Sequence, residues 1–521
     1  MERKWWTLIA VSVAIFMLLL DITVVNVALP DIQRSLHSSF ADLQWVVNAY
    51  SLTLAAFLLT AGALADRFGR RLVFVAGLIV FTLSSAACGL ADSPLALNLA
   101  RAVQGTGGAM MFATSLALIA GAFHGKERGV AFGVFGGVIG GAVAIGPIVG
   151  GVITSGIGWE WIFFVNVPIG IAAVFLTLTQ VSESRDPQAR GVDWLGLLTF
   201  CGSLFLLVFA LIQGNEKGWG STRIVSFLVI SAVLLIAFVF VERHQERPML
   251  DLTLFRRPAF AGASIVAFAV SASMFSMFLY LTLYIQDVLG YGPLQAGLRF
   301  LPVTLLSFFV APLSGRLSVR VPIRLLLGSG LILVGVGLFA MSAVTATSGW
   351  TVLIPGFVLA GAGIGLINPP LASTAVGVVH HSRSGMASGI NNTFRQVGIA
   401  TGIAGLGAIF QHNVTRDTTA ALATGPGREV LHAAHGKLNT ALVSGEVGQI
   451  ARSLPHAARE ALMHSYRIGF TEAFTSILII AGCIALAGSV FAFALVRSSD
   501  FVASHGPVEG EGSEAAPAVA A

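Results

Sequence analysis

The chain has 521 residues, of which 55% are hydrophobic and only 11% are charged, whereas soluble domains carry about 25% charged residues. Together with a mean hydropathy of +0.85, this composition excludes an ordinary soluble protein. The formal net charge of +5 is explained by basic residues beside anionic lipid headgroups, so it gives no reason to expect nucleic acid as a partner. We therefore expect a protein of the lipid bilayer.

Apolar runs of the roughly 20 residues that a helix needs to cross a bilayer recur along nearly the whole chain. The first run is too long for a cleaved signal peptide. Lys and Arg gather in the alternate connections that share a side with the N-terminus, which predicts a multi-pass protein of the cytoplasmic membrane with both termini in the cytoplasm. We expect fourteen spans, near residues 8–30, 44–65, 72–91, 95–120, 130–153, 161–181, 194–213, 223–242, 259–285, 294–314, 323–343, 351–377, 388–411 and 474–496.

Motifs for metal, cofactor or nucleotide chemistry are lacking. The three cysteines lie in separate spans and do not have the spacing of a metal cluster. No histidine lies well inside a span, which disfavours a membrane haem protein, and Gly125-Lys126 does not complete a Walker A motif. We expect no metal, no cofactor and no enzymatic activity. A membrane-embedded enzyme is the alternative from another class.

The first span contains a carboxylate, Asp21, in the stretch LLLDITVVNVALP. It is the only acidic residue well inside an expected span. A charge at mid-bilayer costs about 2.5–3.5 kcal/mol on insertion scales, so such residues normally face a cavity or a partner and serve transport or proton relay. The alternative is a structural ion pair with Arg101 of the fourth span. Because a permanent arginine neighbour would keep the carboxyl charged, we expect Arg101 to approach Asp21 in only one conformation.

The connection after the second span reads GALADRFGRR, residues 62–71. Its glycines, Gly62 and Gly69, allow a tight turn. Its charged side chains can bond to the ends of neighbouring helices; they are Asp66, Arg67, Arg70 and Arg71. A positive-inside anchor would explain the arginines but not Asp66.

The fifth span is rich in glycine, with eight glycines between residues 133 and 151. They create faces, such as that of Gly133, Gly137 and Gly141, where another backbone can approach closely. Pro147 removes a hydrogen-bond donor and permits a bend. A dinucleotide-binding loop is the rival explanation of a glycine run, and no strand–helix–strand context supports it.

An internal repeat relates the two parts of the chain. A shift of 256 residues aligns 129–146 with 385–402 and QGTGGA at 104–109 with AGAGIG at 360–365, while a shift of 253 lays GALADR on GRLSVR at 315–320. Transporters commonly carry such repeats. We expect residues 1–181 and 259–497 to form two six-helix halves, with an inserted helix pair in 182–258, an external segment at 412–470 and a disordered cytoplasmic tail at 498–521.

Four stretches together resemble the signature motifs of the major facilitator superfamily: LDITVVNVALP (20–30), GALADRFGRR (62–71), LARAVQGTGGAMM (99–111) and GGAVAIGPIVGG (140–151). The first of them, with fourteen spans, resembles the drug:proton antiporter branch in particular. The resemblance covers residues 5–500 and implies an all-α major facilitator fold. It also implies that Asp21 and Arg101 couple protons and that the loop 62–71 is a latch between the halves. The fifth-span motif would pack across their interface through Gly141, Gly146, Pro147 and Gly150.

Polar, aromatic and methionine side chains in the spans are candidates for a substrate cavity. Methionine and aromatic rings suit varied apolar ligands because they repack without losing hydrogen bonds, and polar groups in hydrocarbon need partners or water. The candidates are Asn26, Asn48, Tyr50, Gln104, Met110, Met277, Tyr280, Asn391, Asn392, Arg395 and Gln396.

The leading hypothesis is a monomeric, proton-coupled antiporter that exports small lipophilic drugs or antibiotics. The alternative within transport is an exporter dedicated to one natural product made by the same cell. With one acid in the spans, the cavity has little negative charge, so we expect good transport of neutral or monocationic compounds and poor transport of dications. The stretch 428–466 within the external segment suggests short amphipathic helices at the outer mouth.

Overall fold

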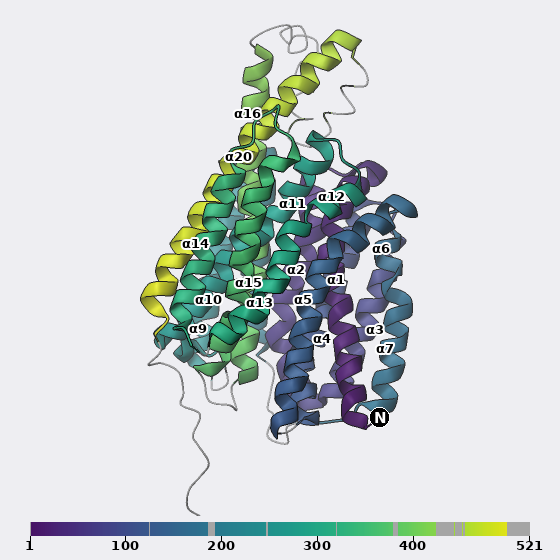
Figure 1. The fold of residues 1–521 in the computed structure, drawn as a ribbon, viewed down its shortest axis with the longest axis vertical. Helices are drawn as coiled ribbons and strands as arrows, with labels where there is room; N and C mark the ends of the chain where they lie inside the picture. Colours follow the sequence, from purple (N-terminus) through teal and green to yellow (C-terminus); the bar gives the residue numbers. More distant parts are fainter. Residues whose placement is uncertain are drawn as a thin grey trace, which may run out of the picture.

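The computed structural model describes residues 2–123, 125–185, 193–245, 248, 250–318, 320–378, 384–423, 442, 447, 451 and 454–497. Every regular element in this part of the chain is helical. Figure 1 shows the purple and blue helices of the N-terminal part packed beside the teal to yellow helices of the C-terminal part.

The N-terminal part is built from long helices joined by short connections. Ser39 begins the second helix through a capping box with Asp42, and Ser93 with Pro94 begins the fourth, as expected from the preferences of helix starts. The helices are α1 (Arg3–Leu36), α2 (Phe40–Phe68), α3 (Arg70–Gly89), α4 (Pro94–Ala122), α5 (Gly125–Gly156), α6 (Trp161–Phe164) and α7 (Asn166–Gln180).

Two further helices, α8 (Trp194–Lys217) and α9 (Thr222–His244), connect this part to the C-terminal one. The C-terminal part contains η1 (Leu252–Arg256), α10 (Pro258–Val270), η2 (Ser271–Phe275), α11 (Ser276–Leu283), η3 (Tyr284–Val288), α12 (Pro293–Arg299), α13 (Leu301–Leu317), α14 (Ile323–Met341), η4 (Trp350–Leu353), α15 (Ile354–Gly377), α16 (Ser384–Ala423) and α20 (His456–Leu495).

The number of membrane spans is close to the expected one. Eleven described helices are long and apolar enough to cross a membrane, and thirteen are reached if each of two bent helix pairs counts as one span. The bends are 41° within α5 and 40° between α12 and α13. The helix α16, which contains the expected span 388–411, is not among these, so fourteen spans stay a prediction.

The packing of the N-terminal helices is repeated in the C-terminal ones. The helix α4 packs against α2 and α3, and α15 packs in the same way against α13 and α14. The contact of α3 with α7 likewise has a counterpart in that of α14 with α20. One apolar cluster, around Phe74 and Phe81, lies within the N-terminal helices. A larger one includes Tyr284 and Phe474 of the C-terminal helices and extends to residues of α1 and α2.

The helices α8 and α9 pair with each other, and α8 packs against α2 and α16. Ser203 and Ser231 tie the pair together, because each hydroxyl donates to the other residue's backbone carbonyl at 2.8 Å. Large apolar side chains of α9, including Ile236 and Phe240, remain exposed. This exposure fits a helix at the lipid-facing edge of the bundle, where hydrocarbon covers apolar side chains.

The helices α16 and α20 have 40 residues each. At 1.5 Å per residue each is about 60 Å long, about twice the 30 Å thickness of a hydrocarbon core. Their ends pack together and project beyond the bundle, opposite to the N-terminus (Figure 1). Both helices continue into the expected segment 412–470, so His456–Tyr466 belongs to one long helix rather than to a short one. Most of residues 424–453 and the tail 498–521 lie outside the described residues.

Candidate functional site

A buried charged network surrounds Asp21 of α1. Nη1 of Arg101, on α4, lies 2.5 Å from Oδ2 of Asp21, and the exposed fractions of the two side chains are 2% and 0%. Two amides donate to Oδ1 of the same carboxylate: Gln104 at 2.9 Å and Asn166, on α7, at 3.1 Å. The sequence raised an ion pair as an alternative, and this conformation contains it.

Further groups fix the arginine. Its Nη1 donates to Oε1 of Gln104 at 2.7 Å, and its Nε donates to the carbonyl oxygen of Val46 at 3.1 Å. The guanidinium carbon stands 4.3 Å from the ring centroid of Tyr50, a distance at which a cation is attracted to the ring. Each partner lies on an N-terminal helix, so the pair is enclosed within one half.

Asn166 was not among the residues expected from the sequence. Its amide also donates to the hydroxyl of Ser85 at 3.0 Å, and that hydroxyl donates to the carbonyl oxygen of Phe163 at 2.9 Å. Asn166 could have been found from the sequence, because its amide lies within the apolar run WIFFVNVPIG, where a polar group needs a partner. Gln104, a candidate for the substrate cavity, donates to Asp21 in this conformation.

The loop 62–71 turns sharply at Gly69, which has a φ of +119°, a conformation that favours glycine. Asp66 accepts from Arg70 at 3.0 Å, and both side chains are partly exposed. The backbone N–H of Arg70 donates to the carbonyl oxygen of Ser184 at 2.8 Å, and that of Arg71 donates to the carboxylate of Glu183 at 2.9 Å. In this conformation these contacts hold the loop on the segment that follows α7.

The glycines of α5 face several neighbours. A Cβ at Gly150 would stand 2.9 Å from the carbonyl oxygen of Val24 in α1, and one at Gly151 would stand 2.7 Å from Cα of Leu294 in α12. At Gly137 and Gly141, no atom of another element lies within 4 Å of that position. The close approach expected along Gly133, Gly137 and Gly141 is therefore absent at the last two, and the side-chain surroundings of Gly133 lie outside the described residues.

Close packing occurs elsewhere on α5. Gly146 faces the side chain of Thr23 in α1, and the carbonyl of Pro147 lies against Gly297 of α12. The helix α5 thus contacts its own half through Gly146 and Gly150 and the other half through Pro147 and Gly151. Steric contact of this kind fits a helix that crosses between halves, because small residues let backbones approach.

The expected cavity residues of the N-terminal half do not form one group. Tyr50 and Gln104 belong to the Asp21 network, whereas Met110 lies against Gly77 of α3. Asn26 donates to the carbonyl oxygen of its own helix at Ile22, at 3.2 Å. Asn48 is fully buried, and neither atom of its amide group has a hydrogen-bond partner among the described residues.

The C-terminal candidates lie mostly on α16 or against it. The hydroxyl of Tyr280 donates to the carbonyl oxygen of Ile403 at 2.6 Å, and Met277 is fully buried. Asn391 donates to the carbonyl oxygen of Ala263 at 3.3 Å. Asn392 donates to the carbonyl oxygen of Ser388, on its own helix, at 3.0 Å. Arg395 donates to Oδ1 of Asn368, on α15, and Oε1 of Gln396 is buried without a partner among the described residues.

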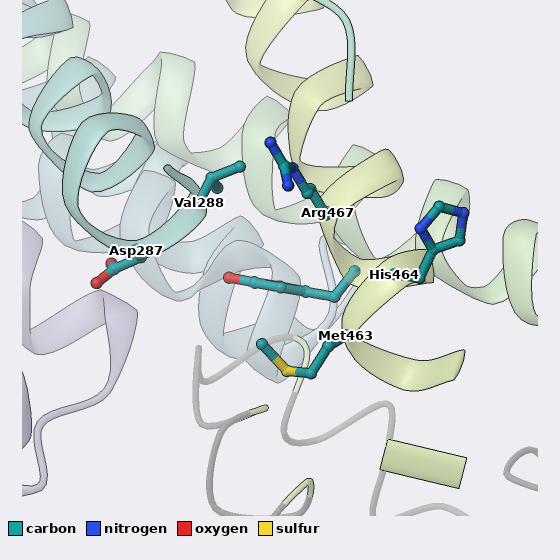
Figure 2. Close-up of a pocket in the computed structure, with 6 residues that line it drawn as sticks. Asp287, Val288, Met463, His464 and Arg467 are labelled. Atoms are coloured by element: carbon teal, nitrogen blue, oxygen red, sulfur yellow. The ribbon is translucent and has the colours of Figure 1, made fainter. Parts of the chain in front are cut away.

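A separate pocket of about 300 Å³ lies between the end of η3 and α20. Figure 2 shows Met463, His464 and Arg467 on α20, opposite Asp287 and Val288. Tyr466 completes its lining. The described residues contain no group of three or more His, Cys, Asp or Glu side chains placed to hold a metal ion.

Long apolar helices that pack as two similar sets, with a charged network enclosed in one of them, are the architecture of a membrane transport protein. The chain belongs to the Major Facilitator Superfamily, whose family model matches residues 11–403. It is a multi-pass membrane protein that transports and is not an enzyme.

The chain is similar to proteins named for drug resistance. It is 40% identical over 404 residues to the multidrug resistance protein Stp of Mycobacterium tuberculosis, covering 77% of this chain and 75% of that one. It is 34% identical to the tetracenomycin C resistance and export protein of Streptomyces glaucescens, covering 79% and 77%. A solved bacterial homologue of the human lysosomal transporter Spinster shares the fold, with a TM-score of 0.61, 18% identity and coverage of 96% and 99%.

Proposed function

We propose that this protein is a proton-coupled antiporter that exports lipophilic drugs or antibiotics across the cytoplasmic membrane. The observation that carries the proposal is the carboxylate of Asp21, buried among Arg101, Gln104 and Asn166. Similarity to multidrug resistance and antibiotic export proteins supports the direction and the kind of cargo.

Proton uptake by Asp21 supplies the coupling step. The protonated carboxyl no longer balances the charge of Arg101, and a buried charge that loses its partner costs about 3–5 kcal/mol. Protonation therefore favours a second conformation in which Arg101 finds other acceptors or water. An inward proton that crosses about 100 mV and one pH unit supplies about 2.3 plus 1.4 kcal/mol, enough for several-hundred-fold accumulation of a neutral solute outside.

The remaining motifs take the roles that the family resemblance implies. The loop 62–71 latches the halves when the cavity opens outward. Gly146, Pro147 and Gly150 belong to the moving interface between halves, whereas Gly141, expected there from the motif, faces open space in this structure. The monomer functions with both termini in the cytoplasm. The cavity accepts neutral and monocationic compounds and disfavours dications. Asp21, the one acid expected well inside a span, is already paired with Arg101, so little negative charge is left to bind a dication.

A dedicated exporter of one natural product is the second candidate. It is favoured by the similarity to the tetracenomycin C resistance and export protein and to a probable actinorhodin transporter of Streptomyces coelicolor, at 33% identity. Breadth of cargo separates the two candidates. Export of many unrelated lipophilic compounds by a strain that lacks its own pumps supports the multidrug function, and export of one compound supports the dedicated one.

Uptake into inside-out membrane vesicles tests the coupling. An acid interior should drive accumulation of ethidium, a lipophilic monocation, and a protonophore should abolish it. The related dication propidium should accumulate poorly under the same gradient. Uptake that requires ATP and ignores the protonophore would remove the antiport proposal. Efficient uptake of propidium would require acidic groups in the membrane beyond Asp21.

A further inference from the structure

Arg395 is a charged side chain in the middle of the helical bundle. It follows the first residue of α16, Ser384, by eleven positions, about 16 Å along the helix axis. Its partner Asn368 precedes the last residue of α15, Gly377, by nine positions, about 14 Å. Both therefore lie well away from the adjacent ends of the two helices. The hydrocarbon core of a bilayer is about 30 Å thick, so these distances place both residues near its middle.

The hydrogen bonds of Arg395 are incomplete. One amino group donates to Oδ1 of Asn368, while Nε is buried without an acceptor among the described residues. A guanidinium has five N–H donors and stays charged in proteins. The Arg395 side chain as a whole is only partly buried, so its other donors remain open to a partner. Arg101, by comparison, has a carboxylate, an amide oxygen and a backbone carbonyl as acceptors.

No described carboxylate compensates Arg395. Among the described residues its side chain donates to the uncharged amide of Asn368, and it forms no ion pair with an acidic side chain. The acidic residues described in the C-terminal half are Asp287, Asp417, Glu460 and Glu472. Charged residues within membranes normally pair or mark the path of a substrate. An unpaired arginine at this depth therefore calls for a negative partner from outside the protein.

The partner Asn368 is held by a rigid local structure. It precedes Pro369 and Pro370, and Pro370 lacks the N–H that would bond to the carbonyl of Leu366. The hydroxyl of Ser314, on α13, donates to that carbonyl at 2.7 Å instead. Neighbouring amides on α16 turn toward backbone carbonyls. The free donors of Arg395 are thus positioned before a ligand arrives, which reduces the cost of binding.

We propose that Arg395, oriented by Asn368, binds an acidic group, a carboxylate or an ionised phenol, on the exported lipophilic compound. The planar guanidinium matches a carboxylate through paired hydrogen bonds. The inference rests on the proposed export function and divides the work between the halves: Asp21 with Arg101 handles the proton, and Arg395 handles the cargo. Acidic compounds gain this contact and bind best, whereas neutral and monocationic compounds are exported without it and bind less tightly.

Binding to the purified protein tests this without a proton gradient. The probes are anthraquinone-2-carboxylate and its uncharged methyl ester, measured by quenching of tryptophan fluorescence. The wild type should bind the acid about ten-fold or more tightly than the ester, as expected for hydrogen bonds to a charged group. Arg395→Gln should remove this preference while changing the affinity for the ester less than about two-fold.

Three further variants distinguish binding of the acidic group by Arg395 from a purely structural role of this residue. Arg395→Lys should keep part of the preference because it keeps the charge, and Asn368→Ala should reduce the preference because the guanidinium loses its orienting acceptor. Arg316→Gln removes an exposed arginine of α13 and should leave both affinities unchanged. If acid and ester lose affinity equally in Arg395→Gln, the residue is only structural.

The wild type alone also decides the matter if Arg395→Gln fails to fold. Equal affinity of the wild-type protein for acid and ester would overturn the proposal. A preference for the acid together with uptake that ignores the proton gradient would instead preserve the acidic-group site and remove the antiport function.

Discussion

At the residue scale, Asp21 shows how a carboxylate is kept inside an apolar bundle. Its two oxygens accept from Arg101, Gln104 and Asn166, so each is satisfied although the exposed fraction of the side chain is 0%. A buried ion pair contributes little net stability, but removal of one partner leaves an isolated charge. Loss of Asp21 alone therefore destabilises this half, and on our proposal protonation of Asp21 triggers its change of conformation.

The variant Asp21→Asn should abolish proton-driven export while binding of neutral compounds persists, because a titratable group is lost without opening a cavity. It should also lower the thermal unfolding temperature in detergent, since Arg101 becomes unpaired. Adding Arg101→Gln should restore stability but not coupling. Asp21→Glu should retain part of the activity with a shifted pH optimum. Proton-driven export by the Asn variant would place the proton site elsewhere.

At the scale of single elements, α5 connects the two halves through small residues. Gly151 stands where any side chain would meet the backbone of Leu294, whereas Gly141 has open space. These two glycines of one helix offer a matched comparison. A substitution at Gly151 changes the contact between α5 and α12, and one at Gly141 changes the helix alone.

We expect Gly151→Val to reduce the initial rate of proton-driven uptake into inside-out vesicles about ten-fold or more, because overpacking pushes α12 away from α5. Gly141→Val should retain most of the wild-type rate. Rates are normalised to the amount of protein in the membrane. Similar losses in both variants would show that helix propensity, rather than the contact between halves, limits transport.

At the scale of the whole molecule, α16 and α20 distinguish the two ends of the bundle. They project at the end opposite to the N-terminus (Figure 1). The loop 62–71 lies against residues 181–184, and its basic residues predict a cytoplasmic position. Because the ends of α16 and α20 project at the opposite end of the bundle, we predict that they lie outside the cell.

Labelling with a membrane-impermeant maleimide tests this orientation. The background replaces Cys88, Cys201 and Cys483 by serine, and single cysteines are introduced by Glu460→Cys or Ser182→Cys, both at exposed positions. The first should react in intact cells and the second only after permeabilisation, with the cysteine-free protein as control. The reverse pattern would invert the topology.

The sequence by itself determined the class of protein, because insertion into a membrane is decided locally. A spanning helix satisfies its backbone within the segment, so apolar runs predict spans directly, and the motifs around Asp21 and Gly69 are contiguous. The family and the all-helical fold followed from these features and are confirmed by the match over residues 11–403. Asp21 itself was recognised because a carboxylate is rare among apolar residues.

Only the tertiary structure decided which side chains meet. Asp21 lies 80 and 145 positions from Arg101 and Asn166, and Gln104 donates to Asp21. Close packing on α5 occurs at Gly150 and Gly151 rather than at Gly141. The physical reason is that lipid and protein interior are both apolar. A helix that is apolar on every face has no periodicity to show which face points inward. Its packing against neighbouring helices alone determines which side chains face the interior.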